Sequence, residues 1–245
     1  MGVRADRLSS RMEALIALVP RCECLADIGC DHGYISIAVA ERGLAERVIA
    51  CDVNEGPLKA ADTHIREAGL SDRIDKRLGD GLERIEPREA DVILISGMGG
   101  RLITRILTEG SSAAKAAASL VLGPQSEVAE LRRYLVSEGY YIDDEDMVLE
   151  DGKYYPLMRV KRPKNHSVEG GINKQSKQCY NDVELRFGPV LIRKKHPILL
   201  QYLQGQQVIL ERNLRSIEDA GADKDRAKSI RAELKDIGEL VKEMS

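Results

Sequence analysis

The sequence contains no Trp and one Phe beside eight Tyr, so aliphatic side chains must build most of the core. Five Cys in 245 residues are too few for a disulfide framework, and Cys22 and Cys24 have no second pair at metal-ligand spacing. We therefore expect reduced thiols and no metal site. The first 20 residues lack the long apolar run of a signal peptide or a membrane span, which predicts a cytoplasmic protein without membrane contact.

The net charge is only −3, which does not favour simple nucleic-acid binding. The charges are, however, unevenly distributed. Residues 1–160 hold 20 Lys and Arg against 28 Asp and Glu, whereas residues 161–245 hold 17 against 12. An acidic body is therefore predicted to carry a basic tail.

Helix and strand patterns alternate along the first two thirds of the chain. Apolar residues at helical spacing predict a first helix that stops at Pro20, and they are Leu8, Met12, Leu15, Ile16 and Val19. Five short apolar runs follow, separated by stretches of helix length: CLADI, RVIACDV, RIDKRL, DVILIS and SLVLG. This order predicts an α/β fold with a parallel sheet and helices on both faces. Within residues 140–162 two β-rich runs are joined by EDG, so an antiparallel hairpin is expected to finish the sheet.

The tail has a different pattern. Residues 163–177 are polar and contain Pro, Gly, Ser and Asn, which is typical of a linker. Two later segments repeat apolar residues at heptad spacing, with Gln207 intruding in the first, namely Leu203, Leu210, Leu214 and Ile217, then Ala227, Ile230, Leu234, Ile237 and Val241. We predict an α/β domain over 1–162, a linker over 163–177 and a helical coiled-coil domain over 178–245. A hairpin within one chain and a dimeric bundle use the same heptads, so monomer and homodimer both stay open.

The stretch LADIGCDHG, residues 25–33, places a polar loop directly after the first predicted strand. Ligands of open parallel sheets bind beyond the carboxyl ends of the strands, so this loop is in the right place for a nucleotide. A dinucleotide loop of the G-x-G-x-x-G type would bring its backbone close to a pyrophosphate. Here Asp31 stands at the place of the central glycine, and its negative charge would repel phosphate. S-adenosylmethionine fits better, because it offers a sulfonium, an ammonium and a ribose diol.

Two further carboxylates follow the next two predicted strands. Asp52 ends the second strand, where it could accept two hydrogen bonds from a ribose diol. Asp80 follows the third strand in LGDGL and could accept from an adenine amino group. A single loop Asp is more often a helix cap or a turn former. Three carboxylates after three successive strands instead favour an adenosyl pocket.

Six segments carry a resemblance to a known family: LADIGCDHGYISI, EGPLKAA, RLGDGL, ISGMGGRLITRIL, LGPQSEVAELRRYL and LEDGKYYPLMRV. Over residues 5–160 they are similar to the bacterial tRNA adenine-N1 methyltransferases that modify adenine 22 in the D-arm. The resemblance implies a Rossmann-like class I methyltransferase sheet with a helical, coiled-coil-like C-terminal extension, and S-adenosylmethionine as cofactor. Cys30 and Gly123 depart from the family, which usually has Ser and Gln there; the second departure puts any role of that side chain in doubt.

The cofactor contacts predicted from the loop, the strand ends and the resemblance are Asp27, Gly29, Asp31, His32, Gly33, Asp52, Val53, Asp80, Gly81, Ser96 and Gly97. The resemblance gives Asp27 a cofactor role and a possible catalytic one. The alternative for Asp27 is a structural role, in which its side chain caps backbone N–H groups of the loop. His32 has no companion His or Cys at a useful spacing, so we do not interpret it as a metal ligand.

N1 of adenine has a lone pair and no proton to lose, so methyl transfer to it needs positioning and electrostatics rather than a strong base. Amino-methyltransferases grip an exocyclic amine with an Asn/Asp-Pro-Pro-aromatic segment after the fourth strand. Here that place holds SGMGG, residues 96–100, which favours a ring nitrogen as the nucleophile. Met98 could pack on the base, and Tyr34 could stack on a base flipped out of a stem. The alternatives are a tight turn for GMGG and a purely packing role for Tyr34.

An RNA substrate requires positive surface, because phosphate contacts supply most non-specific affinity. The candidate RNA-binding residues are Arg4, Arg7, Arg11, Lys161, Arg162, Lys164, Arg193, Lys194 and Lys195. Solvated helix faces often carry such runs without a partner.

Two other functions compete with the methyltransferase. An NAD-dependent oxidoreductase could also use Asp52 on a ribose, but Asp31 and Asp80 oppose it. A non-catalytic adaptor could act through the coiled coil and keep a residual nucleotide pocket. Carboxylates after all three strands argue against such decay.

Overall fold

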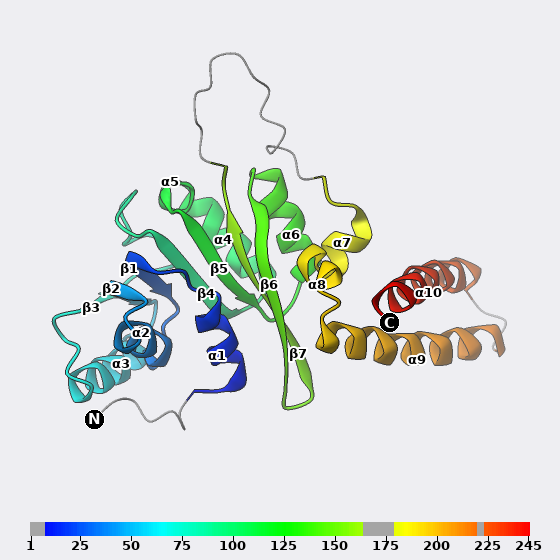
Figure 1. Ribbon diagram of the computed structural model, residues 1–245, viewed down its shortest axis with the longest axis horizontal. Helices are drawn as coiled ribbons and strands as arrows, with labels where there is room; N and C mark the ends of the chain where they lie inside the picture. Colours follow the sequence, from blue (N-terminus) through cyan, green and yellow to red (C-terminus); the bar gives the residue numbers. More distant parts are fainter. Residues whose placement is uncertain (1–7, 164–178, 220–222) are drawn as a thin grey trace, which may run out of the picture. The chain divides into compact units, whose positions relative to one another are not determined.

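The computed structural model describes residues 8–163, 179–219 and 223–245 (Figure 1). Its contacts divide the chain into two compact units, Met1–Cys179 and Tyr180–Ser245. Arg4, Arg7 and Lys164, which we predicted to bind RNA, lie outside the described residues, and so does the predicted linker except for Pro163.

The first unit is built on a seven-stranded sheet, which confirms the predicted fold class. Five strands are parallel: β1 (Cys22–Ile28), β2 (Ala45–Asp52), β3 (Ile74–Leu78), β4 (Val92–Met98) and β5 (Ser119–Pro124). The antiparallel strands β6 (Tyr141–Glu150) and β7 (Lys153–Lys161) complete the order β3-β2-β1-β4-β5-β7-β6. The chain reverses its direction of travel across the sheet between β1 and β4. Ligands of open α/β sheets bind at such a reversal.

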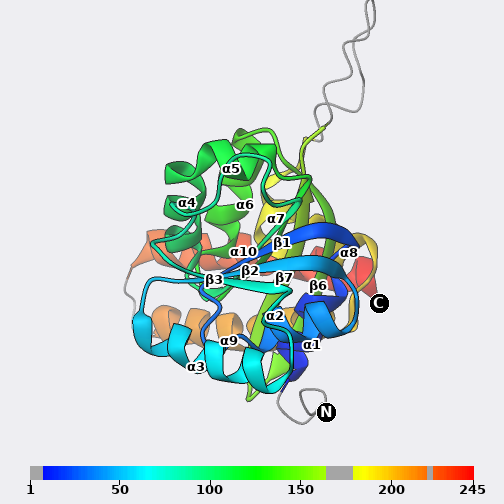
Figure 2. The same ribbon diagram turned by 90° about the vertical axis from the view of Figure 1, so that its left-hand side faces the viewer.

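Helices cover both faces of the sheet (Figure 2). One face carries α1 (Ser10–Ala17), α2 (Tyr34–Glu41) and α3 (Glu55–Glu67), and the other carries α4 (Gly100–Glu109), α5 (Ser111–Ala116) and α6 (Val128–Ser137). Because the central strands are covered on both faces, Leu25, Ala26 and Ile28 of β1 are all buried. The aliphatic core expected from the lack of aromatics is therefore present.

The terminal hairpin has the turn that its sequence predicts. Asp151 and Gly152 both have positive φ, 49° and 74°, as a two-residue type I′ turn requires. One face of this hairpin is tied to α6 by a buried ion pair, in which Nη2 of Arg132 lies 2.8 Å from Oε1 of Glu145. Because both side chains are almost fully buried, the pair fixes α6 against β6.

Helices make up most of the described residues of the second unit. It consists of α7 (Asp182–Phe187), α8 (Pro189–Arg193), α9 (Pro197–Asp219) and α10 (Lys224–Met244). The two long helices pack against each other, and Arg186 of α7 forms ion pairs with Glu233 and Asp236 of α10. The C-terminal helices that the heptads predict are present, whereas a coiled coil stays a prediction. Of the helices described, none combines the length and the apolar character that crossing a membrane needs.

Candidate active site at the carboxyl edge of the sheet

The predicted carboxylates lie where three neighbouring strands end. Asp27 is the penultimate residue of β1, Asp52 is the last residue of β2, and Asp80 follows β3 by two residues. Since β3, β2 and β1 are adjacent and parallel, their carboxyl ends share one edge of the sheet. The structure therefore brings to one edge three acceptors that are far apart in the sequence.

Asp27 is buried, with 2% of its surface exposed. The hydroxyl of Ser36 donates a 2.6 Å hydrogen bond to Oδ2 of Asp27. Burial raises the pKa of Asp27 to about 6, an effect that the hydrogen bonds from Ser36 oppose and the charge of Asp52 reinforces. Burial disfavours the ionised form of this carboxylate, so a cation placed beside it would stabilise that form.

Asp52 braces the loop that follows β1. Its Oδ2 accepts from the backbone N–H of Asp31 at 3.2 Å, and its Oδ1 accepts from the N–H of Asn54 at 2.9 Å. A carboxylate has about four acceptor positions, so these two bonds leave capacity for a diol. The neighbouring Val53 is 59% exposed, so an apolar surface lies beside this carboxylate.

The loop from Gly29 to Gly33 needs its glycines. Both have φ near +75°, which L side chains rarely adopt. A Cβ on Gly29 would overlap Cε of Met98, and a Cβ on Gly33 would lie 3.1 Å from Cβ of Ala61 in α3. Asp31 also has positive φ, 50°, and its side chain is 68% exposed. The predicted cofactor loop thus presents a close-packed backbone and an exposed carboxylate.

The segment SGMGG contains the last three residues of β4, the linking Gly99 and the first residue of α4, and it is fixed by the loop after β5. The N–H of Gly100 donates to the carbonyl of Ser126, and the N–H of Gln125 donates to the carbonyl of Met98, both at 2.9 Å. A Cβ on Gly100 would lie 2.5 Å from the carbonyl oxygen of Glu127. Gly97, with φ of +77°, lies at an irregularity in the pairing of β4, and Gly99 is the N-cap of α4. The segment is therefore a strand end and a helix start rather than a separate tight turn, and it places Met98 beside Gly29.

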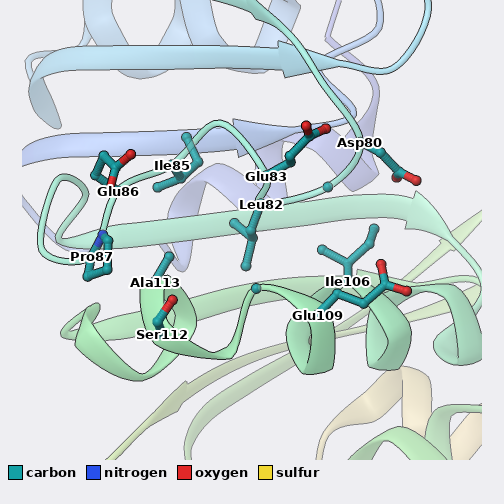
Figure 3. Close-up of a pocket in the computed structure, with 12 residues that line it drawn as sticks. Asp80, Leu82, Glu83, Ile85, Glu86, Pro87, Ile106, Glu109, Ser112 and Ala113 are labelled. Carbon is teal, nitrogen blue, oxygen red and sulfur yellow. The ribbon is translucent and has the colours of Figure 1, made fainter.

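Asp80 is half exposed and lies 3.3 Å from Nη2 of Arg105 in α4. It stands at one end of a cavity of about 480 Å³ between the segment after β3 and helices α4 and α5, with Pro87 and Ser112 at the other end (Figure 3). Leu82 and Ile106 are among the apolar side chains that line this cavity. Gly81, with φ of +56°, lets the segment pack against Ile106.

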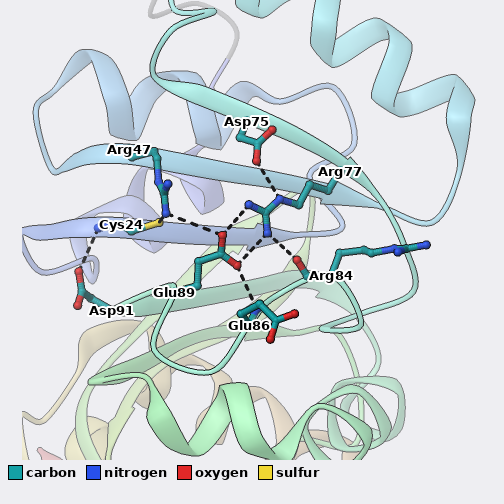
Figure 4. A network of polar contacts seen from close by, with 8 residues as sticks. All are labelled: Cys24, Arg47, Asp75, Arg77, Arg84, Glu86, Glu89 and Asp91. Atoms are coloured by element: carbon teal, nitrogen blue, oxygen red, sulfur yellow. Dashed lines mark hydrogen bonds and ion pairs between the residues drawn. The ribbon is translucent and has the colours of Figure 1, made fainter.

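An ion-pair network fixes the segment that carries Asp80 (Figure 4). The guanidinium of Arg77 in β3 donates to both carboxylate oxygens of Glu89, at 2.9 and 2.6 Å, and the N–H of Glu86 donates to Glu89 at 3.0 Å. Chiefly because of the bond from Arg77, the pKa of Glu89 falls to about 2. The segment between β3 and β4 is thus pinned at its far end.

Three rings flank the cofactor loop: His32, Tyr34 and His64. The ring of Tyr34 stacks on His64 with centroids 5.0 Å apart, and the ring of His32 lies 5.8 Å from Tyr34. Nδ1 of His64 lies 2.9 Å from the carbonyl oxygen of His32. His64 and Arg105 were missed at the level of sequence, because each acts through one contact with a distant segment.

Six of the predicted RNA-binding residues are among the described residues, three in each unit. The guanidinium of Arg11 lies over the ring of Tyr155, Lys161 forms an ion pair with Asp143, and Arg162 lies over Tyr140. Residues 193–195 are exposed at the end of α8, in the second unit. Arg11 and Lys161 both lie in the first unit, but their described contacts are with different residues. Among the described residues, no three His, Cys, Asp or Glu side chains are grouped as metal ligands.

Comparison with known proteins identifies the family. Residues 8–158 match the family model for a methyltransferase domain. The chain is 33% identical over 242 residues to the tRNA (adenine(22)-N(1))-methyltransferase of Bacillus subtilis (strain 168), and the match covers 97% of each chain. The chain belongs to the tRNA (adenine(22)-N(1))-methyltransferase family.

Solved structures similar to this family member contain the cofactor or its product. The Streptococcus pneumoniae protein Sp1610, in complex with S-adenosyl-L-methionine, has a TM-score of 0.81 and 30% identity over 96% of this chain and 99% of that one. TrmK of M. capricolum, in complex with S-adenosyl-homocysteine, has a TM-score of 0.80 and 25% identity over 97% and 99%. Both similarities extend over the helical second unit as well as the sheet.

The residues of this methyltransferase fit that cofactor. The loop has close-packed glycines and no phosphate-binding pattern, and the acceptors at the strand ends suit a ribose diol, an ammonium and an amino group. One family departure also has a structural reason. Gly123 is buried in β5, where a Cβ would lie 3.1 Å from Cβ of Ser96 and 3.3 Å from Leu157, so a Gln would not fit without movement of both neighbours.

Proposed function

We propose that this chain carries out the reaction of its family, the methylation of N1 of adenine 22 in tRNA with S-adenosylmethionine as methyl donor. The observation that carries the proposal is the meeting of Asp27, Asp52 and Asp80 at one edge of the sheet, around a loop that requires its glycines. The cofactor supplies an electrophilic methyl group on a sulfonium. The residues of the chain bind this cofactor, position the target base and stabilise the charge that develops.

The three carboxylates hold different parts of the adenosyl cofactor. Asp52 accepts from the ribose diol while it braces Asp31 and Asn54. Asp80 accepts from the adenine amino group and is held by Arg105. Asp27 acts from beneath the loop as a negative charge for the ammonium and the sulfonium. Gly29, Gly33, Gly81 and Gly97 keep the backbone close to the ligand, and Asp31, His32, Val53 and Ser96 complete the surrounding wall.

The segment SGMGG, at the end of β4, positions the target base. It has no Asn or Asp side chain that could grip an exocyclic amine, and its glycines allow the base to approach the backbone. Met98, fixed over Gly29, offers an apolar surface to a flipped adenine. Because N1 carries a free lone pair, alignment of the base is sufficient and no general base is needed. The product base is cationic, and the ionised Asp27 stabilises the positive charge that develops near it.

The basic residues bind the phosphate groups of tRNA. Arg11, Lys161 and Arg162 lie in the first unit, and Arg193, Lys194 and Lys195 lie in the second, so both units take part in binding. A tRNA substrate also implies that the protein works in the cytoplasm. The long C-terminal helices form a coiled coil, within one chain or between two copies.

Titration of S-adenosylhomocysteine by calorimetry tests the pocket. Asp52→Asn should raise the Kd at least 10-fold, because it weakens both the diol contact and the loop brace, and Asp80→Asn should raise it about 3-fold to 10-fold. Asp72→Asn, an exposed carboxylate before β3, is the matched control and should bind as the wild type does. Unchanged binding by Asp52→Asn and Asp80→Asn would refute the assignment. Binding of NAD in preference to S-adenosylhomocysteine would favour the oxidoreductase instead.

A further inference from the structure

We propose that His64 is a positioning residue for the cofactor loop, which it holds by donating a hydrogen bond to the backbone carbonyl of His32. This inference rests on the proposed function, since it assigns residues 29–33 to the cofactor. His64 lies in α3, outside the carboxyl edge of the sheet, and it is not among the residues predicted to touch the ligand.

The contact with His32 determines which imidazole nitrogen of His64 carries the hydrogen. Nδ1 of His64 lies 2.9 Å from the carbonyl oxygen of His32. A carbonyl can only accept, so Nδ1 must carry the hydrogen. The bond joins two segments 32 residues apart, and its acceptor lies in the middle of the cofactor loop. A bond at that point restrains the peptide unit that joins His32 to Gly33.

A second contact from the same face of α3 supports the loop. Ala61 lies one helical turn before His64, and its Cβ is 3.1 Å from the position that a Cβ on Gly33 would occupy. The helix therefore touches the loop at two consecutive residues, once by packing under Gly33 and once by the bond to His32. Two fixed points define the path of the backbone more strictly than one.

The opposite side of the loop is held by Asp52, which accepts from the N–H of Asp31 at 3.2 Å. The peptide units on either side of residues 31 and 32 are thus bonded from two different elements, β2 and α3. Asp31 has a φ of +50°, a conformation that costs a non-glycine residue free energy and persists only when its surroundings enforce it. Loss of the His64 bond should let this loop relax to other conformations.

His64 also stacks on Tyr34, so a ring effect and a hydrogen-bond effect have to be separated. Two substitutions do so. His64→Asn places a side-chain amide N–H at the position of Nδ1 and removes the ring. His64→Phe keeps a ring for Tyr34 and removes the donor. Thr63→Ala, an exposed neighbour in α3 whose hydroxyl bonds only within its helix at Lys59, is the matched control.

The experiment measures the Kd of the full-length proteins for S-adenosylhomocysteine by calorimetry, together with Tm. The expected result is a Kd within 2-fold of the wild type for His64→Asn and Thr63→Ala, and a Kd raised about 3-fold to 10-fold for His64→Phe, the range that loss of one hydrogen bond gives. The ranking of Kd should not follow the ranking of Tm, because a merely structural role would move the two together.

The proposal is overturned if His64→Phe binds as tightly as the wild type, or if His64→Asn binds no better than His64→Phe. A wild-type protein that binds S-adenosylhomocysteine but transfers no methyl group to tRNA would refute the proposed substrate and leave this inference standing. A wild-type protein that does not bind S-adenosylhomocysteine would refute both.

Discussion

The terminal methyl of Met98 occupies the space that a Cβ on Gly29 would need. Gly29 belongs to the cofactor loop after β1, and Met98 is the last residue of β4, in the segment that we assign to the target base. The two halves of the active site are therefore in direct contact at a position where only glycine leaves room. A substitution in the cofactor loop should therefore also alter the position of Met98, and the reverse.

Substitution of this glycine should weaken both halves of the site. Gly29→Ala must displace the methyl of Met98 and must also adopt a φ of +73°, so we expect at least 10-fold weaker binding of S-adenosylhomocysteine. Gly43→Ala is the matched control, because Gly43 has a φ of +63° and a Cβ added there would meet no atom within 4 Å. It should cost about 1 kcal/mol of stability and leave the Kd unchanged.

A double-mutant cycle isolates the contact itself. In a Met98→Ala background the added Cβ meets nothing at that point, so Gly29→Ala should raise the Kd less than it does in the wild type. An equal rise in both backgrounds would show that the backbone, and not Met98, accounts for the effect.

The raised pKa of Asp27 predicts a pH-dependent stability. The pKa is about 6 in the folded protein, whereas an aspartate in water has an ordinary pKa of 3.8, so the folded state binds the proton more tightly. The free energy of unfolding should therefore fall as the pH rises from about 4 to 6, by about 3 kcal/mol at most. Asp27→Asn, which still accepts from Ser36, should lack this fall. Urea unfolding of both proteins at pH 4 and pH 7.5 measures most of this fall, and parallel changes in the two proteins would contradict it.

The buried pair of Arg132 and Glu145 should dominate the stability of the hairpin. Glu145→Ala leaves a buried guanidinium without this carboxylate and should lower the free energy of unfolding by about 3–5 kcal/mol. Glu138→Ala removes a surface partner of Lys115 and should cost less than about 1 kcal/mol. Denaturant unfolding gives both values, and similar costs for the two variants would show that burial does not set the cost.

Sequence patterns predicted the strands, the hairpin and the strand-end carboxylates for identifiable reasons. Strands covered on both faces have continuous apolar runs, as in CLADI, and the residue that ends each run lies at the carboxyl edge. The turn at Asp151 and Gly152 follows from the conformations that Asp and Gly tolerate. These features are local, so a local pattern is enough to find them.

The supporting contacts were not predictable in the same way. His64 bonds to a carbonyl 32 residues away, and Arg105 reaches Asp80 from 25 residues away. In the local sequence, neither His64 nor Arg105 differs from an ordinary residue on a helix surface. The burial that raises the pKa of Asp27 likewise depends on helices packed over both faces of the sheet. Such properties appear only once the elements have packed together.

The central claim concerns one atom of one nucleotide, so the most direct measurement is position-specific. The purified full-length protein is incubated with S-adenosylmethionine and either an unmodified tRNA transcript with adenine 22 or the same transcript with guanine 22, and nucleosides are analysed by mass spectrometry. The account predicts N1-methyladenosine from the first transcript and none from the second. N1-methyladenosine from both transcripts, or from neither, would contradict it.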